Sequence, residues 1–420
     1  MNIDSTPLPK NVLFTHYGDN WIRGSERCLL DLIKHLDKKL YRPILWCNQP
    51  TMANAAKALG VEVYCSNFPL LFGWQAPRYD FISFTALIEQ AVKLINKHDI
   101  ALIHANSAAP CQWLTFAAKR CQVPLICHLH SIYQLRDRLT LGLYQANMVV
   151  GVSEYVVAPL VCDKKPMHQI KVISNGIDTH QLLAQPVTNL RESLGIPPGD
   201  FVIATLGSLI KRKGVDLIIE ALAKLLKKEI EAHLLVIGAG AELSNLKDQC
   251  IQLGIEKHVS FLGECENAVG ILRGNADLFV SGAREEAFGL VFAEASLAGL
   301  AIVAPDIGGI SDIVINKKSG LLVPSEDVNA LVKSIEHLYL QPHLCIEMAK
   351  AGQTHVMSHY TIKHNTLQFQ HLYQQQLTIP HQKKTLYKKM SSLFVLLGSF
   401  YTALRNRKKR TIKGGLVHER

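Results

Sequence analysis

The 420-residue chain lacks the cysteine patterns of metal and redox sites. Its ten cysteines are scattered, with no Cys-x-x-Cys pair and no Cys/His cluster at zinc spacing. We therefore expect buried free thiols in a reduced, cytosolic compartment. No Asp-x-Asp motif indicates a divalent-cation site, and residues 1–10 contain no apolar core of a secretory signal. No internal repeat argues for a solenoid.

Net positive charge is absent outside the C-terminal segment. The formal net charge is +10, but eleven of the 45 lysines and arginines lie in residues 381–420 beside a single acid, Glu419. The first 380 residues therefore contain as many acidic as basic side chains, which argues against nucleic acid as a ligand. Apolar residues make up 48% of the chain, and its length allows two domains with sizeable cores.

Short apolar runs of strand length recur along the chain. In the first half they lie at residues 12–14, 44–47, 61–65, 101–104, 124–128 and 148–152. The pattern pauses between 179 and 200, where proline and glycine accumulate, and resumes at 201–207, 232–238, 258–262, 276–281 and 301–304. Helical stretches such as 26–40 and 84–98 alternate with these runs, which indicates parallel βαβ units. We expect an α/β protein with two Rossmann-like domains and a ligand cleft between them.

The most informative segment runs from residue 276 to residue 324. A buried strand is followed by a helix-forming stretch, 291–298, and Gly289 lies where one passes into the other. Free backbone N–H groups at a helix N-terminus favour an anion such as phosphate. Glu286 precedes this turn and Glu294 lies about one turn into the helix, so both carboxylates can face one cleft. Carboxylates accept hydrogen bonds from vicinal hydroxyls, so the pattern suits a phosphorylated sugar.

This segment resembles the signature of the family 4 glycosyltransferases, which have the GT-B fold. The family carries Glu-x-Phe-Gly…Glu in this context, and here a Gly308-Gly309 turn follows. The resemblance implies that Glu286 contacts the donor sugar and that Glu294 binds the nucleotide ribose. It also implies that the backbone of three residues approaches the sugar and the diphosphate: Phe288, Gly289 and Leu290. A surface carboxylate pair beside an ordinary turn is the alternative.

A basic loop, GSLIKRKG, begins at Gly207 and precedes a predicted helix. A departing diphosphate needs positive charge nearby, and Arg212 and Lys213 can supply it. In the resembled family the lysine that matches Lys213 contacts the diphosphate. Many members also have an arginine where this chain has Ser208, which shifts the expected phosphate contact to Arg212. Gly238 resembles a Gly-x-Gly turn near the nucleotide, although a plain tight turn explains it nearly as well.

The first half of the chain supplies further matches. The family commonly has Gly-Gly-Ala-Glu where Gly24 begins a helix, and Arg23 replaces the first glycine. The resemblance implies that backbone at Gly24 approaches the sugar-diphosphate. His130 matches a family histidine near the reacting sugar carbon. A neutral imidazole could hold a hydroxyl, and a protonated one could steady negative charge. His128 suits an ordinary hydrogen-bonded residue, and Asn106 ends the preceding strand on the acceptor side.

The resemblance implies a division of the chain into four parts. Residues 1–185 form the acceptor-side domain, 186–358 the nucleotide-sugar donor domain, and 359–378 a helix that crosses back to the first domain. The basic tail, 379–420, contains an uncharged stretch, 390–404. As a helix that stretch reaches only about 22 Å, too short for a bilayer core of about 30 Å. We expect it to bind a membrane surface, with a packing helix and a disordered end as the alternative.

These observations predict a retaining, hexosyl-type glycosyltransferase. It would move a sugar from a nucleoside-diphosphate sugar onto a hydroxyl acceptor, a cell-surface glycan such as lipopolysaccharide or a lipid-linked precursor. In the resembled family the acceptor attacks the face from which the diphosphate leaves. We expect no metal and no further cofactor, and a cytoplasmic location at the inner face of the membrane. A nucleotide-sugar epimerase of similar fold and a non-catalytic binding subunit remain open, the latter because of Arg23 and Ser208.

Overall fold

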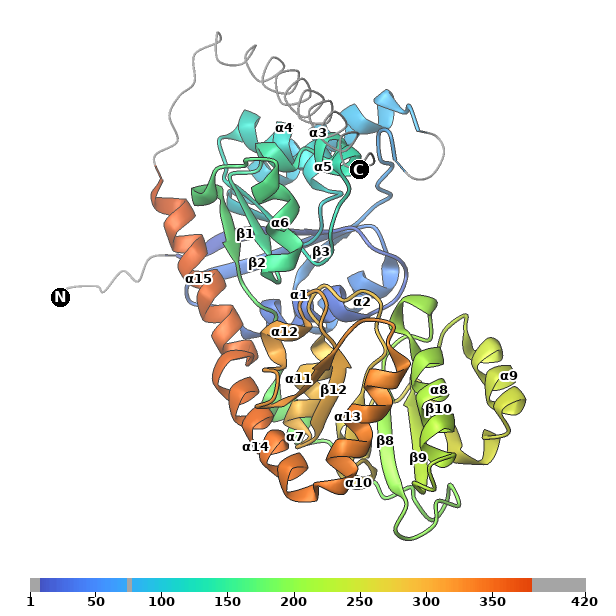
Figure 1. The fold of residues 1–420 in the computed structure, drawn as a ribbon. Helices are drawn as coiled ribbons and strands as arrows, with labels where there is room; N and C mark the ends of the chain where they lie inside the picture. The colour runs from blue at the N-terminus through green and yellow to red at the C-terminus, as the bar shows by residue number, and fades with distance from the viewer. Residues whose placement is uncertain (1–7, 74–77, 380–420) are drawn as a thin grey trace, which may run out of the picture.

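Two parallel β-sheets follow one another along the chain, each covered by helices (Figure 1). The computed structural model describes residues 8–73 and 78–379. The first sheet has the strand order β3-β2-β1-β4-β5-β6-β7, and the second has the order β10-β9-β8-β11-β12-β13. Every pair of neighbouring strands is parallel. The predicted architecture of two Rossmann-like domains is confirmed.

The central strands are buried on both faces because helices cover both sides of a parallel sheet. The strands of the first sheet are β1 (Lys10–His16), β2 (Tyr41–Cys47), β3 (Glu62–Cys65), β4 (Ile100–Ala105), β5 (Leu125–Leu129), β6 (Met148–Gly151) and β7 (Ile170–Val172). Those of the second sheet are β8 (Phe201–Leu206), β9 (Ala232–Ile237), β10 (Val259–Gly263), β11 (Leu278–Val280), β12 (Ala301–Pro305) and β13 (Gly320–Val323).

Helices connect the strands of each sheet. In the first domain they are α1 (Gly24–His35), α2 (Pro50–Ala58), α3 (Phe81–Lys97), α4 (Cys111–Cys121), α5 (Leu135–Thr140) and α6 (Glu154–Cys162), followed by α7 (Thr179–Leu183) in the connection between the domains. In the second they are α8 (Val215–Leu226), α9 (Leu243–Leu253), α10 (Ala268–Asn275), α11 (Leu290–Leu297), α12 (Ile310–Ile313), α13 (Val328–Leu340) and α14 (Pro342–His359), and α15 (Ile362–Thr378) ends the described chain. Short 3-10 turns are η1 (Leu143–Gln145), η2 (Met167–Gln169), η3 (Lys211–Lys213) and η4 (Glu256–His258).

Three differences between the structure and the predicted elements have a clear physical reason. The helix expected over 26–40 ends at His35, since the backbone N–H groups of Leu40 and Tyr41 turn back onto the carbonyl of Asp37. Strands β7 and β13 were not predicted. Both lie at an edge of a sheet and have only three or four residues, so neither has the long apolar run of a central strand.

The chain passes between the domains twice, and the two passages are hydrogen-bonded together. Ile177 and Thr361 form an isolated parallel bridge. The Ile177 N–H donates to the Tyr360 carbonyl at 2.8 Å, and the Ile362 N–H donates to the Ile177 carbonyl at 2.8 Å. A Cβ at Gly176 would lie 2.5 Å from the Thr361 carbonyl oxygen, so only glycine allows this approach.

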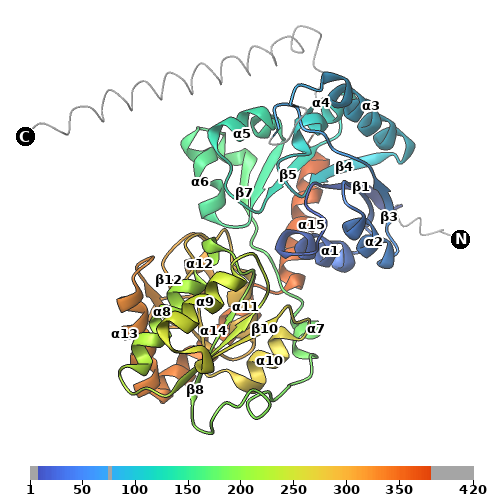
Figure 2. The same cartoon turned by 90° about the vertical axis from the view of Figure 1, so that its right-hand side faces the viewer.

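The last described helix, α15, belongs to the core of the first domain. Its Phe369, Leu372 and Tyr373 are fully buried in one apolar cluster with side chains of β1 and α1. Figure 1 shows α14 and α15 in succession along one side of the molecule, and Figure 2 shows α15 beside the first sheet. No described helix is long and apolar enough to cross a membrane. The predicted membrane-surface stretch, 390–404, lies outside the described residues.

Candidate active site

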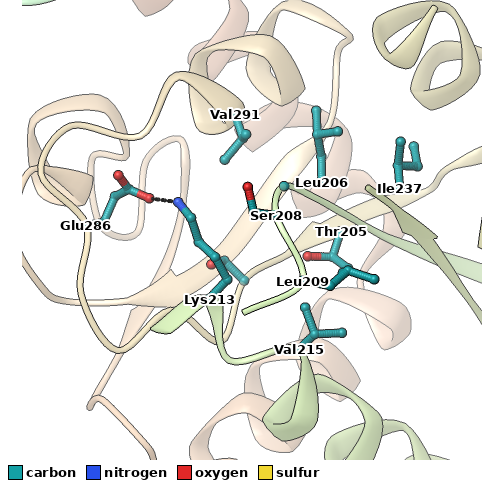
Figure 3. A pocket seen from close by; sticks show the side chains of 11 residues that line it. Thr205, Leu206, Ser208, Leu209, Lys213, Val215, Ile237, Glu286 and Val291 are labelled. Carbon is teal, nitrogen blue, oxygen red and sulfur yellow. Dashed lines mark hydrogen bonds and ion pairs between the residues drawn. The ribbon is translucent and has the colours of Figure 1, made fainter. Parts of the chain in front are cut away.

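A small pocket lies at the carboxyl ends of β8 and β9, where the sheet of the second domain meets the start of α11 (Figure 3). Its polar lining comes from the basic loop after β8 and from the segment before α11. The lining residues are Thr205, Leu206, Gly207, Ser208, Leu209, Lys213, Val215, Ile237, Ser281, Glu286 and Val291. The structure therefore brings together four of the predicted site residues: Gly207, Ser208, Lys213 and Glu286.

The Lys213 ammonium group and the Glu286 carboxylate form an ion pair in this pocket. Figure 3 shows the two side chains pointing toward one another. Glu286 is 8% exposed, so the pair is largely removed from water. The pair supplies both charges that a sugar-diphosphate site needs, a cation for phosphate and a carboxylate for hydroxyl groups.

The basic loop is held in place by a residue that the sequence did not single out. Arg284 donates to both carboxylate oxygens of Asp216, at 2.8 and 2.7 Å, and to the Lys211 carbonyl at 2.8 Å. Beside this anchor, Gly214 has φ +62° and a Cβ there would lie 1.8 Å from the Gly282 carbonyl oxygen. The loop therefore packs backbone to backbone against the end of β11, which aims Lys213 into the pocket.

Arg212 is not part of the pocket. Its side chain is exposed, and its guanidinium donates to the Glu285 carbonyl at 3.2 Å. Gly238 does not line the pocket either. It has φ +136°, and a Cβ there would lie 1.9 Å from the Gly207 carbonyl oxygen, so it lets the ends of β8 and β9 approach. The roles predicted for Arg212 and Gly238 stay predictions.

The segment before α11 is fixed by backbone contacts with the glycine turn. The Glu286 carbonyl accepts from the Gly309 N–H at 3.1 Å, and a Cβ at Gly308 would lie 1.8 Å from the same carbonyl oxygen. Gly289 occupies the N-cap of α11 with φ +96°, a conformation that glycine adopts without strain. The Phe288 ring is buried against Tyr360 rather than in the pocket.

Three contacts link the first domain to this segment and to α11 itself. Ser153, which caps α6, donates to the Ala287 carbonyl at 2.6 Å. A Cβ at Gly24 would lie 3.6 Å from Leu290 Cδ1, so the start of α1 faces the start of α11. The third contact is the ion pair of Arg27 Nη1 with Glu294 Oε1 at 3.5 Å.

Glu294 is therefore near the junction of the domains, but it does not line the pocket around Lys213. It is 7% exposed. Burial raises the pKa of Glu294 to about 7, and the charge of Arg27 offsets only part of this effect. A pKa shifted this far by burial is typical of functional sites, although buried structural carboxyls show such shifts too.

The first domain contributes a polar cluster at the carboxyl ends of β1, β4 and β5. His130 Nε2 lies 3.0 Å from Asn106 Oδ1, and Asn106 Nδ2 lies 3.1 Å from His16 Nδ1. The sequence pointed to His130 and, less directly, to Asn106, but not to His16. His128 is buried beneath His130, and both of its ring nitrogens lack a hydrogen-bond partner among the described residues. The described residues therefore supply no hydrogen bond to the His128 ring, and the role of His128 stays a prediction.

Metal ligands are not grouped in the described part of the chain: residues 8–73 and 78–379 contain no cluster of three His, Cys, Asp or Glu side chains that could hold an ion. All ten cysteines are unpaired.

Comparison with known proteins identifies the chain. The family described as glycosyl transferases group 1 matches residues 186–355, and Glycosyltransferase Family 4 matches residues 22–181. The chain belongs to the family 4 glycosyltransferases. The resemblance seen in the sequence is thus confirmed.

The curated relatives of this glycosyltransferase carry the names of several different enzymes. One is an N-acetyl-alpha-D-glucosaminyl L-malate synthase of Bacillus anthracis, 24% identical over 71% of this chain and 80% of its own length. Another is a GDP-mannose-dependent alpha-(1-6)-phosphatidylinositol monomannoside mannosyltransferase of Mycolicibacterium smegmatis, 28% identical over 62% of this chain and 73% of its own. A lipopolysaccharide core biosynthesis mannosyltransferase of Rhizobium meliloti is 32% identical over 38% of this chain and 48% of its own.

Solved structures share the fold of this glycosyltransferase. A glycosyltransferase from Rickettsia africae aligns with a TM-score of 0.78 and 19% identity over 89% of this chain and all of its own. The Anabaena protein HepE, solved with UDP, aligns with a TM-score of 0.74 and 22% identity over 87% of this chain and all of its own. These likenesses confirm the predicted GT-B fold.

Proposed function

We propose that this glycosyltransferase is a retaining enzyme that moves a sugar from a nucleoside-diphosphate sugar onto a hydroxyl acceptor. The pairing of Lys213 with Glu286 in the pocket after β8 carries the proposal. A diphosphate on the loop that begins at Gly207 would meet the ammonium group. The Glu286 carboxylate would then accept hydrogen bonds from the sugar, and Glu294 would accept them from the ribose hydroxyls.

The proposed reaction needs no dedicated carboxylate base. The acceptor oxygen bonds to the anomeric carbon on the face from which the diphosphate departs. The glycosidic C–O bond breaks, its electron pair leaves with the diphosphate, and a phosphate oxygen takes the acceptor proton. Lys213 would offset the charge that develops on the leaving group, and Glu286 would orient the sugar without attacking it. The donor is the only small molecule required, so we propose no metal and no other cofactor.

The acceptor is proposed to be a cell-surface glycan or a lipid-linked precursor. Two relatives support this class, because their names give phosphatidylinositol mannoside and lipopolysaccharide core as targets. The basic residues around the apolar stretch 390–404 would hold the enzyme at an anionic membrane surface on the cytoplasmic side. Co-sedimentation with vesicles that contain phosphatidylglycerol tests this: the full chain should pellet, and a chain ending at residue 379 should not.

A thermal-shift screen against uridine, guanosine and adenosine diphosphates and their sugar conjugates tests the donor site. A ligand that binds the native state raises its melting temperature by mass action. We expect one nucleotide to give a clear shift that Glu294→Ala abolishes. No shift from any of them would contradict the proposed donor site, and shifts with no transfer to any acceptor would favour the binding-subunit alternative.

A further inference from the structure

Four side chains in the first domain form a continuous hydrogen-bonded chain that ends at His130. Glu26 Oε1 lies 2.9 Å from His16 Nε2, His16 Nδ1 lies 3.1 Å from Asn106 Nδ2, and Asn106 Oδ1 lies 3.0 Å from His130 Nε2. Glu26, His16 and Asn106 are at most 3% exposed. Water therefore competes little for these bonds, and their donors and acceptors must match each other.

The orientation of the Asn106 amide follows from a second contact. Asn106 Nδ2 also lies 3.1 Å from the Ser25 carbonyl oxygen. A carbonyl oxygen only accepts, so the group that faces it must be the amide NH2. The amide oxygen of Asn106 is then the atom that faces His130, and His130 Nε2 must carry the proton that this oxygen accepts.

The same orientation determines the state of His16. The second N–H of the Asn106 amide points at His16 Nδ1, which must accept and is therefore unprotonated. His16 Nε2 carries the ring proton and donates it to the Glu26 carboxylate. Burial alone would raise the pKa of Glu26, but the hydrogen bonds from His16 and from backbone N–H groups lower it below its usual range. Glu26 is thus an obligate acceptor at the far end of the chain.

The backbone leaves space for this arrangement at one residue. A Cβ at Gly18 would lie 2.6 Å from His16 Nε2 and 2.7 Å from Glu26 Oε1, directly against the bond between them. Glu26 Oε2 also accepts from the Arg23 N–H at 3.1 Å. The chain therefore connects His130 to the backbone that precedes Gly24, at the start of α1.

We propose that Asn106, oriented by His16 and Glu26, is a positioning residue that holds His130 in its Nε2–H tautomer and leaves Nδ1 as an acceptor for a ligand hydroxyl. No hydrogen bond from the described residues reaches His130 Nδ1. The ring packs on His128 with centroids 4.2 Å apart. Burial, with His128 and His16 nearby, lowers the pKa of His130 well below its usual range despite the opposing charge of Glu26. The hydroxyl as ligand rests on the proposed function, whereas the tautomer does not.

Long-range 1H–15N spectra of the full chain labelled with 15N-histidine test the tautomer, because protonated and bare imidazole nitrogens differ strongly in 15N shift. The His130 signals are identified by their loss in His130→Gln. We expect His130 to be protonated at Nε2 alone at about pH 7.5. Asn106→Ala should raise the Nδ1–H population at least fivefold. Once the donor is known, it should also lower kcat at least tenfold, with donor KM changed less than threefold.

Two further variants separate positioning from general damage. Asn106→Asp keeps an oxygen acceptor for His130, so the His130 tautomer should persist. The second carboxyl oxygen faces both His16 Nδ1 and the Ser25 carbonyl oxygen, so a proton on that carboxyl oxygen or on His16 would replace the amide N–H. Asn48→Ala removes the side chain that bonds both the N–H and the carbonyl of Gly18, at 3.0 and 2.9 Å, but touches neither imidazole. It should leave both His130 and His16 unchanged.

Several outcomes would overturn the proposal. They are a wild-type His130 protonated at Nδ1, an unchanged tautomer in a folded Asn106→Ala, and a His130 that loses its Nε2–H tautomer in a folded Asn106→Asp. If Asn106→Ala does not fold, the aspartate variant decides. Since the spectra require no nucleotide sugar, a failure of the proposed transfer reaction would leave the tautomer result intact, and the converse also holds.

Discussion

Glu286 is fixed by contacts of both its side chain and its backbone. Its carboxylate pairs with Lys213, and its backbone carbonyl accepts a hydrogen bond from the Gly309 N–H. Its position therefore does not depend on the charge of the side chain alone. We expect Glu286→Gln to keep the fold and to lower turnover about 100-fold or more, since the neutral amide loses the charged acceptor for the sugar. Transfer rates and the melting temperature are measured together. The exposed neighbour Glu285→Gln is the control, and near-normal transfer by Glu286→Gln would contradict the assignment.

Lys213 and Arg212 are adjacent in sequence but differ in what they face. Lys213 lines the pocket, whereas Arg212 is exposed and bonds a backbone carbonyl. We expect Lys213→Ala to weaken diphosphate binding at least about tenfold, as the loss of a charge-assisted hydrogen bond implies. Arg212→Ala and Lys211→Ala should each change it less than threefold. Titration calorimetry measures this, and equal losses at 212 and 213 would support the predicted phosphate contact of Arg212.

The buried carboxyl of Glu294 makes stability depend on pH. Burial raises its pKa from 4.5 to about 7, so the folded chain binds more protons than the unfolded chain between these values. Stability therefore falls as pH rises through this window, by on the order of 2 kcal/mol. The glutamine of Glu294→Gln does not titrate, so from about pH 5 to pH 7.5 it should gain stability relative to wild type. Urea unfolding of both proteins across this pH range measures the difference. If the free energies of unfolding of wild type and Glu294→Gln changed in parallel with pH, the raised pKa of Glu294 would be contradicted.

At the scale of elements, the turn before α8 depends on one glycine. Gly214 and Gly254 have almost the same φ, +62° and +68°, but a Cβ at Gly214 meets the Gly282 carbonyl and one at Gly254 meets nothing within 4 Å. Gly254→Ala should therefore cost about 1 kcal/mol from backbone conformation alone. Gly214→Ala should cost about 2 kcal/mol more, because the backbone at Gly282, just after β11, must move aside. Denaturant unfolding of the two variants tests this. Equal losses of stability would mean that the loop can move to relieve the contact at Gly214 without cost.

The sequence was sufficient for the elements whose signal is local. Runs of apolar residues in the sequence predict the central strands. The Glu-x-Phe-Gly…Glu signature is also local, because it lies within one strand–turn–helix unit. Edge strands β7 and β13 lack such runs. The contact between Arg284 and Asp216 joins residues 68 positions apart, and that between Arg27 and Glu294 exists only because two domains meet. Neither the spacing nor the composition of the sequence indicates which distant residues meet, so these contacts of the site could be identified only from the structure.

For the molecule as a whole, the first domain is completed by α15, the last helix of the described residues. Phe369 of α15 is fully buried in the first domain, whereas Leu367, two residues earlier, is 44% exposed. We expect Phe369→Ala to lower the free energy of unfolding by about 3 kcal/mol, from lost transfer energy and the cavity left behind. Leu367→Ala should stay within about 0.5 kcal/mol. Chemical denaturation measures both, and similar losses would show that α15 contributes little to the core.

The chain connects the two domains twice, through segments that are hydrogen-bonded to each other at Ile177 and Thr361. This double connection predicts how the protein behaves when its backbone is cleaved. A single cleavage between residues 184 and 199 severs the first passage, but the C-terminal piece still carries α15, whose side chains are embedded in the N-terminal piece. The two fragments should therefore stay associated after a nick in this connection. The gene could accordingly be divided at this point. The two halves, expressed separately, should reassemble because the N-terminal half needs α15 of the C-terminal half to complete its core.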